Sequence, residues 1–221
     1  MTSSIKDRIK ALRGKVFNQA CEKNMGHIAP SLSCLDIIGV LSYIPEFTGD
    51  KIVISKGHGC YAVYAIKDEW GTGCLEGFGS LGHGLPIAVG NAFGMKLLGK
   101  KGHIWCIVGD GEMQEGSMWE ALNFLQHHNL DNISVIIDNN GLQAMDKVEN
   151  ILKHNLEDRL KAWGLDTWVC DGHNIDKLYY ILKFKPRVLI ANTIKGKGYK
   201  VMENIPKFHF RVPNGDERLN S

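Results

Sequence analysis

The sequence predicts an α/β fold, with a parallel sheet of about five strands and helices on both of its faces. Short apolar runs of strand length recur along the chain, and stretches with helical spacing separate them. The clearest unit covers residues 103–137, where an apolar run, a helical stretch and a second apolar run follow one another. This order is typical of a parallel sheet, whose strands are buried on both faces. We expect a single domain over residues 1–221.

The first part of the chain is expected to be mostly helical. Apolar residues at helical spacing predict a helix over 3–24, and Pro30 begins a second helix after a short turn. Residues 51–55 have the composition of a strand, and a helix over 60–70 follows a glycine-rich turn. A further helix is expected over 83–98.

The central unit consists of a strand at 103–108, a helical stretch at 112–129 and a strand at 133–137. Alternating helices and strands continue to the C-terminus. We expect a helix within 147–160, a strand at 167–171, a helix at 175–184 and a strand at 187–193. The tail, 195–221, is polar and is expected to pack on a neighbouring chain.

Composition excludes several classes of protein. The chain has 221 residues, a formal charge of +2 and no stripe of basic and aromatic residues, so we expect no nucleic-acid partner. No apolar run approaches the length that spans a bilayer, and the N-terminus lacks the apolar core of a signal peptide. None of the six cysteines forms a CxxC pair, which favours buried free thiols and a cytoplasmic location.

Two polar turns follow the two strands of the central unit. Gly109-Asp110-Gly111 comes directly after the first strand, and Asp138-Asn139-Asn140-Gly141 comes after the second. Ligands of open α/β sheets bind at the carboxyl ends of the strands, so both turns are expected to face one crevice. Gly111 allows a backbone N–H to approach a phosphate closely. Asp110, Asn140 and a carbonyl just past Gly141 supply hard oxygens suited to Mg²⁺, which would bridge to a diphosphate-bearing cofactor.

Each turn alone is also an ordinary turn sequence. Together with their flanks, however, they resemble the thiamine diphosphate fingerprint of the transketolase family, in which GDG is followed after about thirty residues by NN. Further similar segments occur in the family's order from about residue 15 to 217. They are Ser55-Lys56-Gly57-His58-Gly59, Gly79-Ser80-Leu81-Gly82-His83-Gly84-Leu85, Thr193-Ile194-Lys195-Gly196-Lys197-Gly198, Met202-Glu203-Asn204 and Phe208-His209.

The resemblance implies a thiamine diphosphate-binding fold of the type that holds the diphosphate (a PP-type domain). It implies that Asp110, Asn140 and the backbone carbonyl of Leu142 hold Mg²⁺. It also implies catalytic roles for His27, His58 and His209, with His27 and His209 orienting the donor. The residues expected to bind the cofactor are His58, Gly82, Gly109, Asp110, Gly111, Glu112, Asn140, Leu142 and His209.

The same resemblance implies an enzyme of two chains. Transketolases transfer a two-carbon ketol unit from a ketose, often a sugar phosphate, to an aldose. The glutamate that activates the cofactor's pyrimidine ring lies in a second domain, which this sequence does not include. We therefore expect a C-terminal transketolase subunit that supplies this glutamate and the pyrimidine pocket, most simply in an α₂β₂ heterotetramer.

The sequence departs from the family between the SKGHG helix and the GSLG turn. Only about nine residues, 71–79, join the two, and a histidine that the family carries there has no counterpart. Two alternatives therefore stay open. One is the α subunit of a 2-oxo acid dehydrogenase, which shares GDG and NN. The other is a non-catalytic subunit that keeps the pocket as a scaffold.

Overall fold

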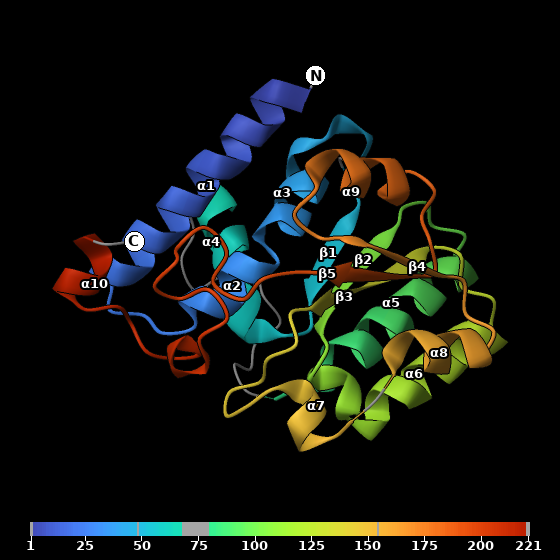
Figure 1. The fold of residues 1–221 in the computed structure, drawn as a ribbon. Coiled ribbons are helices and arrows are strands. Elements are labelled where there is room, and N and C mark those ends of the chain that lie inside the picture. The colour runs from blue at the N-terminus through green and yellow to red at the C-terminus, as the bar shows by residue number, and fades with distance from the viewer. Residues whose placement is uncertain (1, 48, 68–79, 154, 220–221) are drawn as a thin grey trace.

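The computed structural model describes residues 2–47, 49–67, 80–153 and 155–219. Its centre is a five-stranded, fully parallel sheet with the strand order β1-β2-β3-β5-β4 (Figure 1). The strands are β1 (Lys51–Ile54), β2 (Ile104–Gly109), β3 (Ile133–Asn139), β4 (Thr167–Asp171) and β5 (Val188–Asn192). The predicted fold class is confirmed.

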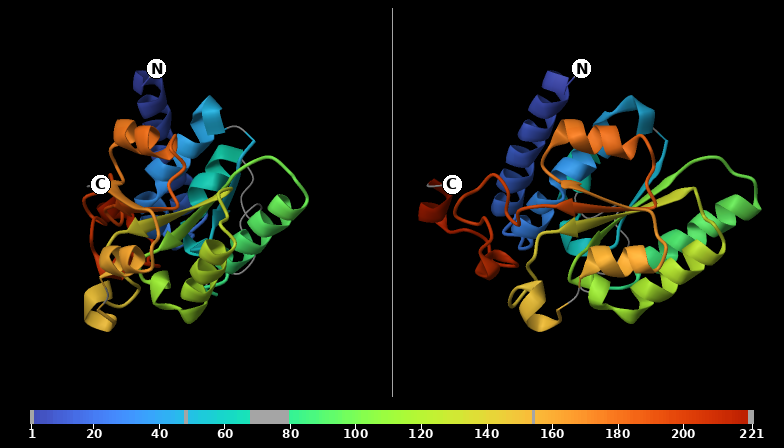
Figure 2. Two further views of the ribbon diagram at one scale, coloured as in Figure 1. Left: turned by 90° about the vertical axis from the view of Figure 1, so that its right-hand side faces the viewer. Right: turned by 45° about the vertical axis from the view of Figure 1, so that its right-hand side comes forward.

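Helices cover both faces of the sheet, as the two views of Figure 2 show. One face carries α1 (Thr2–Glu22), α2 (Ile28–Ser33), α3 (Leu35–Tyr43), α4 (Tyr61–Lys67) and α9 (Ile175–Leu182). The other carries α5 (Gly84–Leu97), α6 (Gly116–His127) and α8 (Leu156–Ala162). The shorter elements are α7 (Val148–Ile151), α10 (Gly215–Leu219) and 3₁₀ turns at Pro45–Phe47, Gly57–Gly59, Glu112–Gln114 and Pro206–Phe208.

Strand β2 explains why the apolar runs are nearly continuous. All six of its residues are buried. Successive side chains of a strand point to opposite faces, so Trp105 and Ile107 join the core under α1 and α3, whereas Cys106 and Val108 join the core under α5 and α6. A strand covered by helices on both faces needs apolar residues at every position.

Two expected helices are interrupted next to the carboxyl end of the sheet. The stretch 112–129 consists of a 3₁₀ turn and α6, separated by Glu115 in an extended conformation with ψ of 137°. The helix expected from Pro30 instead begins at Ile28 and breaks at Cys34. Apolar periodicity detects the helices but not these breaks, because the flanking residues keep helical spacing.

The tail contributes to the core of its own chain. Met202 and Phe208 are fully buried, and the ring of Tyr199 stacks on Phe17 of α1 with centroids 3.8 Å apart. Packing of the tail on a neighbouring chain stays a prediction. The expected short loop at 71–79 lies outside the described residues.

Two expectations from composition can be compared with the described part of the chain. Its five cysteines are all buried, as predicted, and none of them forms a disulfide within the described ranges; they are Cys21, Cys34, Cys60, Cys106 and Cys170. Among the helices in these ranges, none is both long and apolar enough to span a bilayer.

Candidate active site

The two polar turns lie side by side at the carboxyl end of the sheet. Gly109 is opposite Asp138 in the parallel register of β2 and β3. The N–H of Gly141 donates to Oδ2 of Asp110 at 2.5 Å, and the N–H of Asp110 donates to the carbonyl of Asp138 at 3.3 Å. Neighbouring parallel strands therefore bring together residues about thirty positions apart, as the sequence predicted.

A cavity of about 310 Å³ opens between these turns and several other segments of the chain. Its lining residues are His27, Pro30, Lys56, His58, Leu81, Gly109, Asp110, Gly111, Glu112, Asn140, Leu142, Gln143, Ala144, Lys195 and His209. Every predicted site residue except Gly82 lines it, and the N–H of Gly82 donates to Glu112 at 3.0 Å. A larger, shallower depression of about 730 Å³ shares Asp110, Asn140 and Leu142 with this cavity.

Asp110 is almost completely buried, with 3% of its surface exposed. Its oxygens accept from the backbone N–H groups of Gly111 (2.7 Å) and Gly141 (2.5 Å). Burial and the nearby charge of Asp138 raise the pKa of Asp110 to about 6. A carboxylate in this setting is stabilised by a cation, and its oxygens can accept more than one contact each.

Asn140 has a fixed amide orientation. Its Nδ2 donates to Asp138 at 3.2 Å, and its Oδ1 accepts from the N–H of Leu142 at 3.1 Å. The amide oxygen keeps a second lone pair. Asp110, Asn140 and the carbonyl of Leu142 thus form a set of hard oxygen donors that suits Mg²⁺. Within the described residues, no group of three or more His, Cys, Asp and Glu side chains could hold a metal.

Glu112 joins the segments that build the cavity. One carboxylate oxygen accepts from Ser55 Oγ at 2.6 Å and from the N–H of Gly82, and the other accepts from the N–H of Gly109 at 3.2 Å. Burial raises the pKa of Glu112. Both oxygens therefore have partners within the protein, and a direct contact of Glu112 with a cofactor stays a prediction.

The three predicted catalytic histidines cluster on one wall of the cavity. The ring centroids of His27 and His209, and of His58 and His209, are 5.3 Å apart, and those of His27 and His58 are 5.7 Å apart. Burial is the main cause that lowers all three pKa values, that of His58 well below the usual range and that of His209 to about 3. At neutral pH each ring is uncharged and can both donate and accept one hydrogen bond.

The turn that carries His27 is shaped by the tail. His27 has a φ of 62°, a left-handed conformation that is uncommon for a residue other than glycine. Its ring packs against Phe210 at 4.7 Å. A Cβ at Gly26 would lie 2.2 Å from the Phe210 carbonyl oxygen, so only glycine fits there. Such backbone strain is often found at functional sites.

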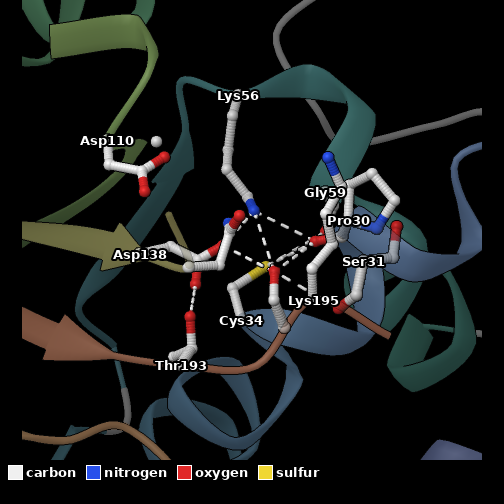
Figure 3. Close-up of polar contacts among 12 residues, drawn as sticks. Pro30, Ser31, Cys34, Lys56, Gly59, Asp110, Asp138, Thr193 and Lys195 are labelled. Atoms are coloured by element: carbon white, nitrogen blue, oxygen red, sulfur yellow. Dashed lines mark hydrogen bonds and ion pairs between the residues drawn. The ribbon is translucent and has the colours of Figure 1, made fainter. Parts of the chain in front are cut away.

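The wall of the cavity includes one member of a buried ion pair that the sequence did not predict. Lys56 bonds to Asp138, and the side chains are 1% and 0% exposed (Figure 3). Asp138 also accepts from Ser33 Oγ at 2.6 Å and from Thr193 Oγ1. Burial opposes both charges, but their mutual attraction prevails, so the pKa of Asp138 is lowered and that of Lys56 is raised.

Lys195 is a second buried lysine, 2% exposed, at the edge of the cavity. Its Nζ contacts the carbonyl of Gln143 and Nδ1 of His209, both at 2.8 Å, and the carbonyl of Leu142 at 3.3 Å. Burial and repulsion by Lys56 lower the pKa of Lys195 to about 8. Both lysines stand in motifs that resemble the family, but motif position alone does not reveal their partners.

Comparisons with known proteins identify the relatives of this chain. Residues 57–162 match the family model "Thiamine pyrophosphate enzyme, C-terminal TPP binding domain". The chain is 32% identical to the A subunit of apulose-4-phosphate transketolase from Actinobacillus succinogenes, and the match covers 96% of this chain and 92% of that protein. A second protein of that name, from Phocaeicola vulgatus, is 31% identical, with 87% and 83% coverage.

Longer relatives match over part of their length. Transketolase-like protein 2 of Mus musculus is 33% identical over 93% of this chain, which covers 39% of that protein. The crystal structure of transketolase from Campylobacter jejuni superposes with a TM-score of 0.85 at 25% identity, covering 98% of this chain and 42% of that one. From its sequence, its fold and its relatives, the chain belongs to the transketolase family.

Proposed function

We propose that this chain is the thiamine diphosphate-binding subunit of a two-chain transketolase, which transfers a two-carbon ketol unit from a ketose or ketose phosphate to an aldose. The observation that carries the proposal is the junction of the two strand tips. Asp110 and the loop 140–142 meet through a direct hydrogen bond and line the same cavity as three neutral histidines.

We assign Mg²⁺ and the cofactor's diphosphate to the strand tips. The carboxylate of Asp110, the amide oxygen of Asn140 and the carbonyl of Leu142 would hold the cation, whose charge would stabilise the buried Asp110 in its ionised form. His58, as a neutral donor, would hold a diphosphate oxygen. Gly82, Gly109 and Gly111 would form the backbone of the pocket.

When bound, thiamine diphosphate supplies the nucleophilic ring carbon that accepts and releases the ketol unit. This chain's histidines would act on the sugar. A neutral ring can donate its N–H to a substrate oxygen, so His27 and His209 would orient the hydroxyl groups and stabilise charge on the reacting oxygen. Their low pKa values keep them available as neutral hydrogen-bonding groups at physiological pH.

The second chain is proposed because two relatives of this length are named as A subunits. It would supply the glutamate and the pyrimidine pocket, and two copies of each chain would complete two sites. The names of those relatives also suggest the first donor to test, apulose 4-phosphate, beside common ketose phosphates. The cytoplasm is the compartment we propose for the complex.

Calorimetry tests the proposal directly. The purified chain is titrated with thiamine diphosphate and Mg²⁺, alone and together with the product of the adjacent reading frame. We expect binding that requires Mg²⁺ and is tightest with the second chain present. Ketol transfer should need both chains, and light scattering should give the mass of two copies of each.

The same experiment separates the alternatives. Absence of cofactor binding under both conditions would identify a scaffold subunit. Cofactor binding with activity only in the presence of a lipoyl-bearing partner would identify a 2-oxo acid dehydrogenase subunit. Full ketol transfer by this chain alone would contradict the two-chain proposal.

A further inference from the structure

A second set of buried charges lies behind the cavity and does not line it. Asp36 of α3, 4% exposed, bonds to Nη2 of Arg13 in α1 at 2.5 Å and to Nδ1 of His173 at 2.6 Å. His173 lies in the turn between β4 and α9, and its side chain is 10% exposed. The network therefore joins α1, α3 and this turn, three elements that contribute no catalytic residue to the proposed site.

The hydrogen bonds of His173 determine where its ring proton lies. The backbone N–H of Ile194 donates to Nε2 of His173 at 2.8 Å. A backbone N–H is only a donor, so Nε2 must be the acceptor. The ring proton then lies on Nδ1 and is donated to Asp36. His173 is thus a neutral ring with a defined tautomer and two satisfied nitrogens.

The network holds both ends of one short segment, residues 194–197. His173 accepts from the N–H of Ile194, and Nη1 of Arg13 donates to the carbonyl of Lys197 at 2.7 Å. Between these points the N–H of Gly196 donates to the carbonyl of Ala29 at 3.0 Å. The backbone of Lys195 is therefore fixed from both sides by groups outside the cavity.

Lys195 links this fixed segment to the cavity, which its side chain lines. A charged ammonium is only a donor, so the contact at 2.8 Å makes Nδ1 of His209 the acceptor. The ring proton of His209 then lies on Nε2. The same ammonium also contacts the carbonyls of Leu142 and Gln143. One lysine thus sets both the proton position of a site histidine and the position of the loop after Asn140.

We propose that His173 is a positioning residue, which acts through the segment 194–197 and Lys195 to hold His209 as its Nε2–H tautomer. Asp36 and Arg13 support it by fixing the ring proton of His173 and the far end of the segment. If the proposed function holds, this tautomer has a direct consequence for the substrate, because His209 would present an N–H, and not a lone pair, to the oxygen of the sugar.

Nitrogen NMR of the full chain labelled with ¹⁵N-histidine tests the proposal without requiring activity. Long-range proton–nitrogen spectra distinguish a protonated ring nitrogen from an unprotonated one, and His209→Gln assigns the signals. In the unchanged chain we expect an unprotonated Nδ1 and a protonated Nε2 for His209. In Lys195→Met and in His173→Leu we expect the chemical shifts of both His209 ring nitrogens to become averages of the protonated and unprotonated states.

Two variants serve as controls. His173→Gln keeps an acceptor for the N–H of Ile194 and is expected to restore the single tautomer of His209. His103→Leu removes another buried histidine, which contacts Ser134 Oγ at 2.9 Å at the opposite end of β2, and is expected to leave His209 unchanged. An unchanged His209 in folded His173→Leu, or the same change in His103→Leu, would overturn the proposal.

If His173→Leu does not fold, Asp36→Asn decides the question. This variant keeps the ring at position 173 but removes the charge that holds its Nδ1 proton. We expect a partial loss of the single His209 tautomer, and an unchanged spectrum would overturn the proposal. The two proposals fail in different measurements. If the positioning role of His173 is wrong, the NMR spectra contradict it while the chain still binds the cofactor. If the proposed function is wrong, calorimetry detects no cofactor binding, while the expected NMR spectra can still be observed.

Discussion

The two ends of the sheet use polar groups in different ways. At the amino end, Asp50 accepts from the N–H of His103 and from Nε1 of Trp105, and His103 contacts Ser134. Nζ of Lys185 also lies 3.8 Å from the Asp50 carboxylate, so the charge at this end has an ion-pair partner. At the carboxyl end, Lys56 and Asp138 form an ion pair, but within the described residues the hydrogen-bond partners of Asp110 and Lys195 are all neutral. Groups that pair internally support the fold, and buried charges without an ion-pair partner mark a place for ligands.

The largest effect is expected at the ion pair between Lys56 and Asp138. Lys56→Met leaves the Asp138 carboxylate buried without its partner and should cost about 3–5 kcal/mol in the free energy of unfolding. Urea denaturation measures it. Lys195→Met removes a buried lysine that has no carboxylate partner and should cost much less. Equal losses would show that the two lysines do not differ in the way proposed.

At the amino end, His103 should contribute to acid stability, as the buried histidines of the carboxyl end also should. Burial lowers the pKa of His103 to about 4 from 6.5, so the folded state binds fewer protons than the unfolded state between these values. The contribution of the neutral His103 ring to the free energy of unfolding is fully present above about pH 6.5. As the pH falls toward 4, up to about 3 kcal/mol of this free energy is lost. Denaturation of the unchanged chain and of His103→Gln at several pH values measures it. Identical pH profiles would contradict this assignment.

Cofactor affinity should depend on the carboxyl end alone. Asp110→Asn removes the only charged group of the proposed Mg²⁺ site and should weaken Mg²⁺-dependent binding of thiamine diphosphate at least about 100-fold, or about 2.7 kcal/mol. Calorimetry in the presence of the second chain measures it. Asp131→Asn, at an exposed position before β3, is the matched control and should bind normally. Loss of binding in both variants would point to a general defect.

The smallest effect is expected at Asp50, at the amino end of the sheet. Asp50→Asn keeps one acceptor and loses the other, so the hydrogen bond to either His103 or Trp105 weakens. The expected cost is about 1 kcal/mol in the free energy of unfolding, with no change in cofactor affinity. A change in affinity would show that the amino end is coupled to the site.

Pattern reasoning predicted the sheet and the meeting of the two strand tips because both depend on local rules. Apolar runs identify buried strands, and adjacent parallel strands place their following turns together. For the same reason Asp110 and Asn140 could be placed in one cavity. His27, His58 and His209 come from three separate segments, and only the resemblance to a family indicated that they belong together.

The groups that were missed depend on distant contacts. Lys56 and Asp138 are 82 positions apart, and no local pattern distinguishes a buried lysine from a solvated one. The bonds of Glu112 to Ser55, Gly82 and Gly109 were also missed, and its predicted contact with the cofactor stays a prediction. The polar composition of the tail concealed Met202 and Phe208, which are buried in the core.

The most direct test is a crystal structure of the two-chain complex grown with thiamine diphosphate and Mn²⁺ in place of Mg²⁺. The anomalous signal of Mn²⁺ locates the cation independently of the protein. We predict one cation per site, bound by the side-chain oxygens of Asp110 and Asn140 and by the carbonyl of Leu142. A cation bound elsewhere, or Asp110 and Asn140 turned away from each other with no shared cation, would contradict the account.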